Sequence, residues 1–209
     1  MTVTQALLQF AAASAVLTVI PGMDSTLVLR SALVRGRRHA VVTGLGISVG
    51  LLLWGAAAAL GAAALLAASE LAFRAVTVVG AAYIAYLGVR MIVNSFRTTH
   101  LDFTATEAAP TSWSAFANGL GTNLLNPKIG VFYIATIPQF IGGSGSPLAM
   151  GVLLAAVHAL ITVLWFAVLI TGASAARRWL ANARALRIID RIAGAVLIAL
   201  AAKLALDHP

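Results

Sequence analysis

Two proline-centred motifs interrupt segments of this 209-residue chain that are otherwise apolar enough to cross a membrane. In the first motif Pro21 and Gly22 precede Asp24, and in the second Pro127 precedes Lys128. Proline lacks a backbone N–H and collides with the carbonyl four residues earlier, so each motif predicts a break in its helix. Hydrocarbon cannot satisfy freed backbone groups or charges, so such breaks persist only where they line an enclosed or water-filled cavity. Two broken helices that each carry a charge are typical of a transport site.

The composition indicates a membrane protein. Of all residues 61% are hydrophobic and 10% are charged, whereas soluble domains have about 25% charged residues. The formal net charge of +8 does not indicate nucleic-acid binding. The basic residues lie in short loops between apolar segments, which is the pattern that orients a protein in a bilayer. The chain has no Cys, which excludes a disulfide framework and thiol chemistry.

Windows of about 20 apolar residues predict six membrane-spanning helices. The predicted spans cover residues 7–29, 40–67, 71–93, 116–141, 148–171 and 188–206. We therefore expect an all-α integral membrane domain with three parts. These are a first three-helix repeat at 1–93, a cytoplasmic linker at 94–115 and a second three-helix repeat at 116–209.

The distribution of Lys and Arg predicts the orientation of these spans. Eleven arginines lie in or next to the loops that follow the first, third and fifth spans, against Arg74 and Lys203 on the other side. The eleven are Arg30, Arg35, Arg37, Arg38, Arg90, Arg97, Arg177, Arg178, Arg184, Arg187 and Arg191. Basic loops remain in the cytoplasm. We therefore expect both termini on the periplasmic side of a bacterial inner membrane.

An internal repeat is visible in the same pattern. Pro21 and Pro127 occupy similar places in the first and fourth spans, 106 positions apart. The third and sixth spans share Gly-Ala-rich stretches at 80–88 and 194–202. Because each half has an odd number of spans, the second half enters the bilayer from the opposite side. The sequence thus predicts two inverted three-helix repeats, with helices 1 and 4 broken and a site near the midplane.

The two motifs also resemble a known family. The Pro-Gly-Met-Asp turn at 21–24, with the basic loop that follows, resembles the start of the LysE/RhtB amino-acid exporters. The Asn-Leu-Leu-Asn-Pro-Lys motif at 123–128 and Ile-Pro-Gln-Phe at 137–140 resemble that family's second-half signature. Family members typically read Pro-Gly-Pro in the first motif, where this chain has Met23. The resemblance implies six helices and export of amino acids or related metabolites, driven by the proton-motive force.

The residues around the breaks suit a zwitterion. Lys128 and the N–H groups that follow Pro127 are candidates for binding a substrate carboxylate, near the positive end of a half-helix. Asp24 is the candidate for binding an ammonium group or for carrying the coupling proton. Asn123 and Asn126 lie three positions apart, on roughly one helical face, and offer neutral donors and acceptors.

Two further residues belong to the predicted site. For several of the site residues a purely structural role is an alternative to the functional one. Ser25 completes the predicted substrate-binding set, and His158 in the fifth span is a second candidate for proton coupling. Asp24 and Lys128 can instead form a structural ion pair. The asparagines and His158 can instead make interhelical hydrogen bonds.

The function predicted from the sequence is secondary-active export of amino acids or related zwitterionic metabolites by antiport with H⁺ or Na⁺, in contact with membrane lipid. No cofactor is expected, and a homodimer is left open. An ion exporter or channel is the alternative, although a single midplane carboxylate argues against a metal site. The G-x-S-x-G pattern at 46–50 would indicate an intramembrane serine protease. That motif needs a strand-to-helix turn, and here it lies within a predicted helix, so we expect no enzyme.

Overall fold

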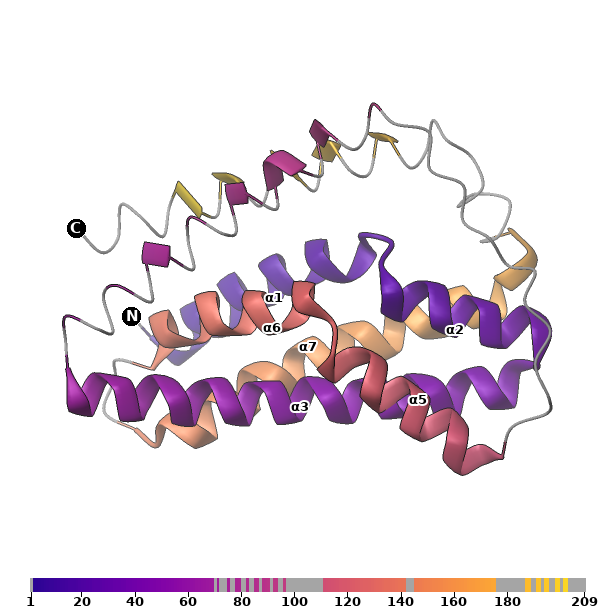
Figure 1. Ribbon diagram of the computed structural model, residues 1–209, viewed down its shortest axis with the longest axis horizontal. Helices are drawn as coiled ribbons and strands as arrows, with labels where there is room; N and C mark the ends of the chain where they lie inside the picture. The colour runs from indigo at the N-terminus through magenta and orange to yellow at the C-terminus, as the bar shows by residue number, and fades with distance from the viewer. Residues whose placement is uncertain are drawn as a thin grey trace.

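The computed structural model consists of α-helices, with no strand among the residues that it describes (Figure 1). It describes residues 2–69, 111–141 and 145–175 continuously, and scattered residues between 71 and 96 and between 187 and 202. The helices are α1 (Val3–Val19), α2 (Met23–Val34), α3 (Arg37–Ala68), α5 (Ser112–Leu124), α6 (Pro127–Thr136), the short 3-10 helix η1 (Ile137–Phe140) and α7 (Pro147–Thr171). The predicted spans at 71–93 and 188–206 and most of the predicted linker lie largely outside the described residues.

Several of these helices can cross a membrane. Helices α3 and α7 are long and apolar enough, and α1 with α2 gives a third candidate span that is bent by 53°. With 32 residues, α3 is about 48 Å long, more than the roughly 30 Å of a bilayer's hydrocarbon core. Helices α5 and α6 have only 13 and 10 residues. The described part of the chain is all α-helical and includes helices able to cross a membrane, and the count of six spans stays a prediction.

Local sequence decides where these helices begin. The Gln5 amide donates to Thr2 Oγ1 at 3.2 Å, and the Thr2 amide donates to Gln5 Oε1 at 3.0 Å, which forms a capping box at α1. Asn126 and Ser146 cap α6 and α7. Each is followed by proline at the first helical position, where a backbone N–H has no partner within the helix. Gly36, between α2 and α3, has φ +90°, which side-chain-bearing residues rarely adopt.

Helices α3 and α7 run most of the length of the molecule and cross at small residues (Figure 1). A Cβ placed on Gly55 would collide with Ala155 and lie 2.8 Å from the Gly151 carbonyl oxygen. A Cβ placed on Gly151 would collide with Ala59 and lie 2.7 Å from the Gly55 carbonyl oxygen. The two backbones therefore touch, and their contacts are reciprocal.

Helix α5 packs against the first half of α3 in the same manner. Gly46 faces the Phe116 backbone so closely that a Cβ there would overlap with it, and Gly119 faces the Thr43 backbone in the same way. The Ser48 hydroxyl donates to the carbonyl of the preceding turn at 2.9 Å. The G-x-S-x-G pattern is thus part of a packed α-helix and forms no nucleophile elbow.

The scattered residues of the third and sixth predicted spans also contact one another. A Cβ on Gly88 would lie 2.6 Å from the Gly194 carbonyl oxygen and 2.8 Å from Ile198 Cγ1. A Cβ on Gly194 would lie 2.5 Å from the Gly88 carbonyl oxygen and 2.7 Å from Ile92 Cγ1. Each glycine therefore contacts the backbone of the other glycine and the isoleucine that lies four positions after that other glycine. The two Gly-Ile pairs are 106 positions apart in the chain.

An aromatic cluster packs α1 against α6, η1 and α7. Phe10 of α1 is fully buried, and its ring centroid lies 5.5 Å from that of Phe132, 5.8 Å from that of Phe140, 6.1 Å from that of Tyr133 and 6.3 Å from that of His158. Most of these pairs meet edge to face, a favoured geometry for aromatic rings. The buried group at the α2 end is smaller and consists of Val28, Ala40, Ile47, Phe166, Leu169 and Ile170.

Candidate functional site at the two helix breaks

The two interrupted helices meet at their breaks. The gap between α1 and α2 contains Pro21 and Gly22, and the gap between α5 and α6 contains Asn126. Asp24 lies in the first turn of α2, and Lys128 in the first turn of α6. Side chains from each break contact the helix pair of the other break. The structure therefore brings together the residues that the two sequence motifs single out.

The Asp24 carboxylate accepts hydrogen bonds from both asparagines. Asn123 Nδ2 lies 2.8 Å from Asp24 Oδ2, and Asn126 Nδ2 lies 3.2 Å from Asp24 Oδ1. The orientation of the Asn126 amide is fixed, because its Oδ1 accepts the Lys128 backbone N–H at 3.1 Å as the cap of α6. Two neutral amides thus hold the carboxylate in place of a cation.

Lys128 is held by the backbone of α1. Its Nζ donates to the Leu17 carbonyl at 3.2 Å and to the Ile20 carbonyl at 3.3 Å. In an uninterrupted helix the Leu17 carbonyl would accept from the N–H of residue 21, which is proline and has none. Gly22 leaves room for this approach, since a Cβ there would lie 3.0 Å from Lys128 Nζ. The lysine replaces the hydrogen bond that Pro21 removes.

Trp54 of α3 has the same role at the second break. Pro127 removes the N–H that would donate to the Asn123 carbonyl. The Trp54 indole Nε1 donates to that oxygen at 3.4 Å, alongside the Asn126 backbone N–H at 3.0 Å. We did not single out Trp54 from the sequence. The available signal was that it is the sole Trp, Tyr or Phe of α3 and lies in mid-helix, whereas membrane tryptophans concentrate near the interfaces.

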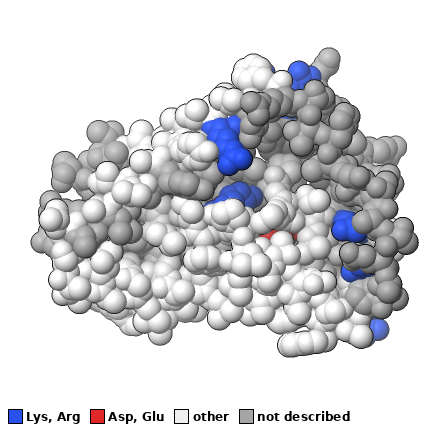
Figure 2. Space-filling view, in the orientation of Figure 1, with Lys and Arg blue, Asp and Glu red and all other residues white. Residues whose placement is uncertain are grey.

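The Asp24 and Lys128 side chains do not form an ion pair with each other within the part of the chain that the structure describes. Each is instead held by uncharged groups of the opposite break. Asp24 is the only acidic residue among the described ones. The space-filling view shows a small acidic patch and basic atoms in the middle of one face (Figure 2). An acidic and a basic side chain, each held by uncharged partners, are the central feature of the site.

The other two predicted residues, Ser25 and His158, are both buried. Ser25 is buried on α2 with 6% of its surface exposed. His158 is buried on α7, and its Nδ1 lies 3.0 Å from the Tyr133 hydroxyl while its Nε2 lies 3.1 Å from Thr18 Oγ1. The Thr18 hydroxyl already donates its only proton to the Ser14 carbonyl at 2.7 Å.

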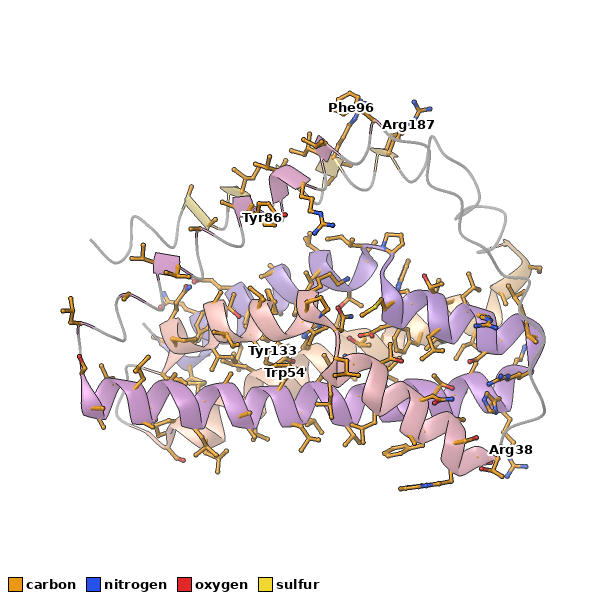
Figure 3. All side chains as sticks on the ribbon, viewed as in Figure 1. Arg38, Trp54, Tyr86, Phe96, Tyr133 and Arg187 are labelled. Carbon is orange, nitrogen blue, oxygen red and sulfur yellow. The ribbon has the colours of Figure 1, made fainter. Side chains whose placement is uncertain are left out.

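This hydrogen-bond network determines the proton positions on the His158 ring. Thr18 Oγ1 can only accept, so Nε2 carries a proton, and in the neutral ring Nδ1 accepts from the Tyr133 hydroxyl. The network joins α1, α6 and α7, and Figure 3 shows Tyr133 close to Trp54 between α3 and α6. Among the described residues these hydrogen bonds do not extend to Asp24.

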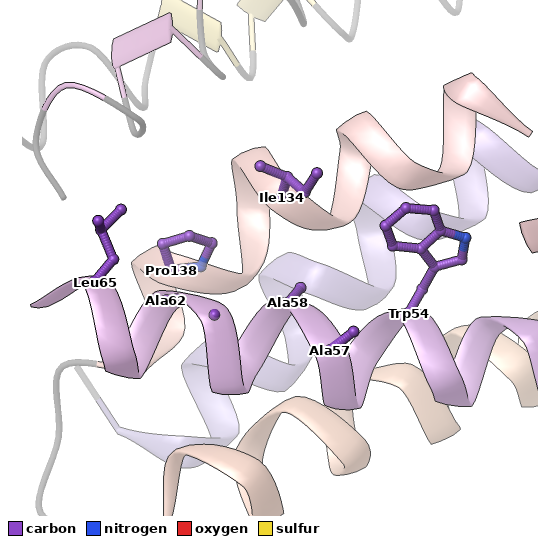
Figure 4. Close-up of a pocket in the computed structure, with 8 residues that line it drawn as sticks. Trp54, Ala57, Ala58, Ala62, Leu65, Ile134 and Pro138 are labelled. Atoms are coloured by element: carbon purple, nitrogen blue, oxygen red, sulfur yellow. The ribbon is translucent and has the colours of Figure 1, made fainter. Parts of the chain in front are cut away.

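An apolar groove of about 210 Å³ lies between α3 and the α6–η1 segment (Figure 4). Trp54 is at one end and Leu65 at the other, with Ile134 and Pro138 on the opposite side and small residues of α3 along the floor. These side chains offer nothing to bind the charges of a zwitterion. The described residues also contain no group of three or more His, Cys, Asp or Glu side chains that could hold a metal ion.

Comparisons with known proteins identify the family of this chain. The family model for the LysE type translocator matches residues 15–208. An uncharacterized membrane protein, YrhP, of Bacillus subtilis (strain 168) is 30% identical over 96% of this chain and 99% of its own length. A threonine efflux protein of Escherichia coli (strain K12) is 26% identical over 84% and 85% of the two chains. A putative amino-acid transporter, YggA, of Aeromonas salmonicida is 31% identical over 69% of each chain.

No solved structure matches the chain. The family match covers the helix breaks, Asp24, the two asparagines and Lys128. The protein is a membrane transporter and not an enzyme. The chain belongs to the LysE type translocator family.

Proposed function

We propose that the protein is a secondary-active exporter of amino acids or related zwitterionic metabolites, and that the two facing helix breaks bind the cargo. The observation that carries this proposal is that Asp24 and Lys128 lie at facing breaks without pairing with each other. A carboxylate held by two amides can exchange one of them for a cationic ammonium group. The names of two relatives, a threonine efflux protein and a putative amino-acid transporter, support this substrate class.

The groups for the cargo's carboxylate lie on the other side of the break. Lys128 uses two of its three N–H bonds for α1 carbonyls, which leaves one for a substrate oxygen. Gly22, at the start of α2, makes no side-chain cap, so the first N–H groups of α2 are available close to Lys128. The start of α6 is less open, because Asn126 already caps it. An amino acid therefore binds with its ammonium at Asp24 and its carboxylate between Lys128 and the start of α2.

Asp24 also provides the coupling in this proposal. One carboxylate cannot hold a substrate ammonium and a coupling cation at the same time, so binding of one expels the other. That competition produces antiport, with H⁺ or Na⁺ as the returning ion. His158 is the weaker candidate because both of its ring nitrogens already have partners.

The repeat architecture is part of the proposal. We infer six spans that form two inverted repeats, 1–93 and 116–209, joined by a cytoplasmic linker at 94–115, with both termini periplasmic in an inner membrane. Two sets of reciprocal contacts support it. Where α3 crosses α7, a glycine of each helix faces an alanine of the other. In the third and sixth spans, the two contacting Gly-Ile pairs are separated in the chain by the same number of positions as the two prolines. The Arg191 guanidinium lies 4.5 Å from the centre of the Phe96 ring, and this contact between the two halves supports the proposal that their basic segments share one side of the membrane. In the view of Figure 3, Phe96 and Arg187 are labelled beside each other.

The orientation is tested by labelling single cysteines. The chain has no native Cys, so Ser146→Cys and Arg38→Cys, both at exposed positions, each introduce one thiol. In intact cells a membrane-impermeant maleimide should label Ser146→Cys at once and Arg38→Cys only after permeabilisation. The reverse pattern would place both termini in the cytoplasm and contradict the proposed direction of transport.

The transport activity is tested by counterflow in proteoliposomes. Purified protein is reconstituted with a panel of radiolabelled amino acids, with and without a pH or Na⁺ gradient. We expect exchange of at least one amino acid, accelerated by one of the two gradients, and none with Asp24→Asn. Correctly inserted protein that exchanges no amino acid but conducts ions would overturn the proposal in favour of an ion exporter or channel.

A further inference from the structure

Trp54 contacts both halves of the broken α5–α6 helix. Its indole Nε1 donates to the Asn123 carbonyl, at the end of α5, at 3.4 Å. Its six-membered ring lies against Gly130 of α6, where a Cβ would lie 2.7 Å from Cη2 and 2.8 Å from Cζ2 of the indole. A side chain larger than hydrogen at position 130 would displace the ring. One residue of α3 therefore fixes two points on opposite sides of the break.

The preceding turn of α3 accommodates the Asn123 side chain. A Cβ on Gly50 would lie 2.5 Å from Asn123 Oδ1 and 2.9 Å from Asn123 Cβ. Gly50 and Trp54 are four positions apart and so lie on one face of α3. On this face Trp54 contacts the Asn123 carbonyl, and Gly50 makes room for the Asn123 side-chain amide. The same amide donates to Asp24 Oδ2 at 2.8 Å.

We propose that Trp54 is a positioning residue of the transport site, whose indole N–H and ring set the bend between α5 and α6 and so aim the Asn123 amide at Asp24. Its effect on transport rests on the proposed function, whereas its effect on the bend does not. Asn123 is fully buried, so without the indole N–H its carbonyl keeps only the backbone donors of the break. Losing the indole N–H therefore loosens the end of α5.

The variants separate the N–H from the bulk of the ring. Trp54→Phe removes the indole N–H and part of the ring. Incorporation of 3-benzothienylalanine at position 54 replaces the N–H by sulfur and keeps the shape of the indole. Trp165→Phe is the matched control, because Trp165 Nε1 is buried and makes no hydrogen bond in the structure.

The first measurement is the geometry of the break. Spin labels at Ser112→Cys on α5 and Gln139→Cys on η1 report the distance across it, in a chain without other cysteines. We expect pulsed electron paramagnetic resonance to show a shifted or broadened distance distribution for Trp54→Phe and for the benzothienyl variant. The Trp165→Phe distribution should match that of the parent. Unchanged distributions in both position-54 variants would overturn the proposal.

The second measurement is amino-acid counterflow by the same proteins. Loss of one aimed hydrogen bond should raise KM about three- to tenfold in both position-54 variants, with Trp165→Phe unchanged. A parent protein that moves no amino acid would sink the proposed function while the distance measurement still decides the role of Trp54 in the bend. A shifted distance with unchanged KM would overturn the link from Trp54 to Asn123 and Asp24.

Discussion

The Lys128 ammonium lies 3.2 Å from the Leu17 carbonyl oxygen, although 111 positions separate the two residues. The contact exists because Pro21 cannot supply the N–H that this carbonyl would receive in a continuous helix. A break in one half of the chain is thus completed by the charge that follows the break in the other half. Lys128 is therefore both a member of the proposed binding site and the cap of α1.

Replacing Lys128 by Met should destabilise the protein. The change leaves the Leu17 and Ile20 carbonyls without their donor, and an unsatisfied buried group costs about 1–3 kcal/mol. Thermal unfolding in detergent measures the loss, with Lys128→Arg as a control that retains donors. In a Pro21→Ala background residue 21 again has an N–H for Leu17, so the loss should be smaller. An equal loss in both backgrounds would show that Lys128 does not replace the missing hydrogen bond.

Asp24→Asn should abolish transport and leave the fold intact. The new amide group can donate to Asn123 if the Asn123 side chain flips, because Asn123 Oδ1 is buried without a partner in the native protein. Asn126 can go on donating to the oxygen of residue 24. We expect normal membrane insertion and an unfolding temperature close to that of the parent, with no counterflow. A well-folded variant that transports normally would exclude Asp24 as the coupling group.

His158 should be dispensable for ion coupling. Its ring nitrogens are used by Tyr133 and Thr18 in an interhelical network. We expect His158→Gln to lower stability by about 1 kcal/mol and to slow transport. The number of coupling ions moved per amino acid, measured as the ratio of the two fluxes, should stay the same. A variant that moves amino acids without ions would transfer the coupling role to His158.

The crossing of α3 and α7 should tolerate no added methyl group. Gly55→Ala would place its Cβ against Ala155 and Gly151, and overpacking of this kind costs about 1–3 kcal/mol. Gly61→Ala on the same helix is the control, because its Cβ would meet no atom within 4 Å. Helix propensity favours alanine there by about 0.5–1 kcal/mol. Thermal unfolding should therefore move in opposite directions, and a shared direction would contradict the crossing.

The sequence located the breaks well because proline acts locally. Pro21 and Pro127 each remove the hydrogen bond to the carbonyl four residues earlier. The positions at which the helices stop can therefore be predicted from the sequence. The charges that follow them were identified for the same reason. The second predicted span, 40–67, falls within α3 for a similar reason, since hydrophobicity over 20 residues is a property of one segment.

The partners of these groups could not be predicted. Trp54 donates across 69 positions and His158 contacts Thr18 across 140 positions, and nothing in either local sequence indicates the other member. The asparagines illustrate the same limit. Their spacing left two roles open, contact with a cargo and interhelical hydrogen bonding, and did not identify Asp24 as the group to which both donate. These partners become known only from the positions of the two breaks relative to each other in the fold.

The aromatic cluster between α1 and α6 has a kinetic consequence. For cargo to leave between these helices, the rings of Phe10 and Phe132, with centroids 5.5 Å apart, must separate. The hydrogen bonds of His158 to Tyr133 and Thr18 must open in the same movement. If the proposed cargo takes this route, separating these packed rings is the slow step, and the transport rate should rise steeply with temperature whatever molecule is carried.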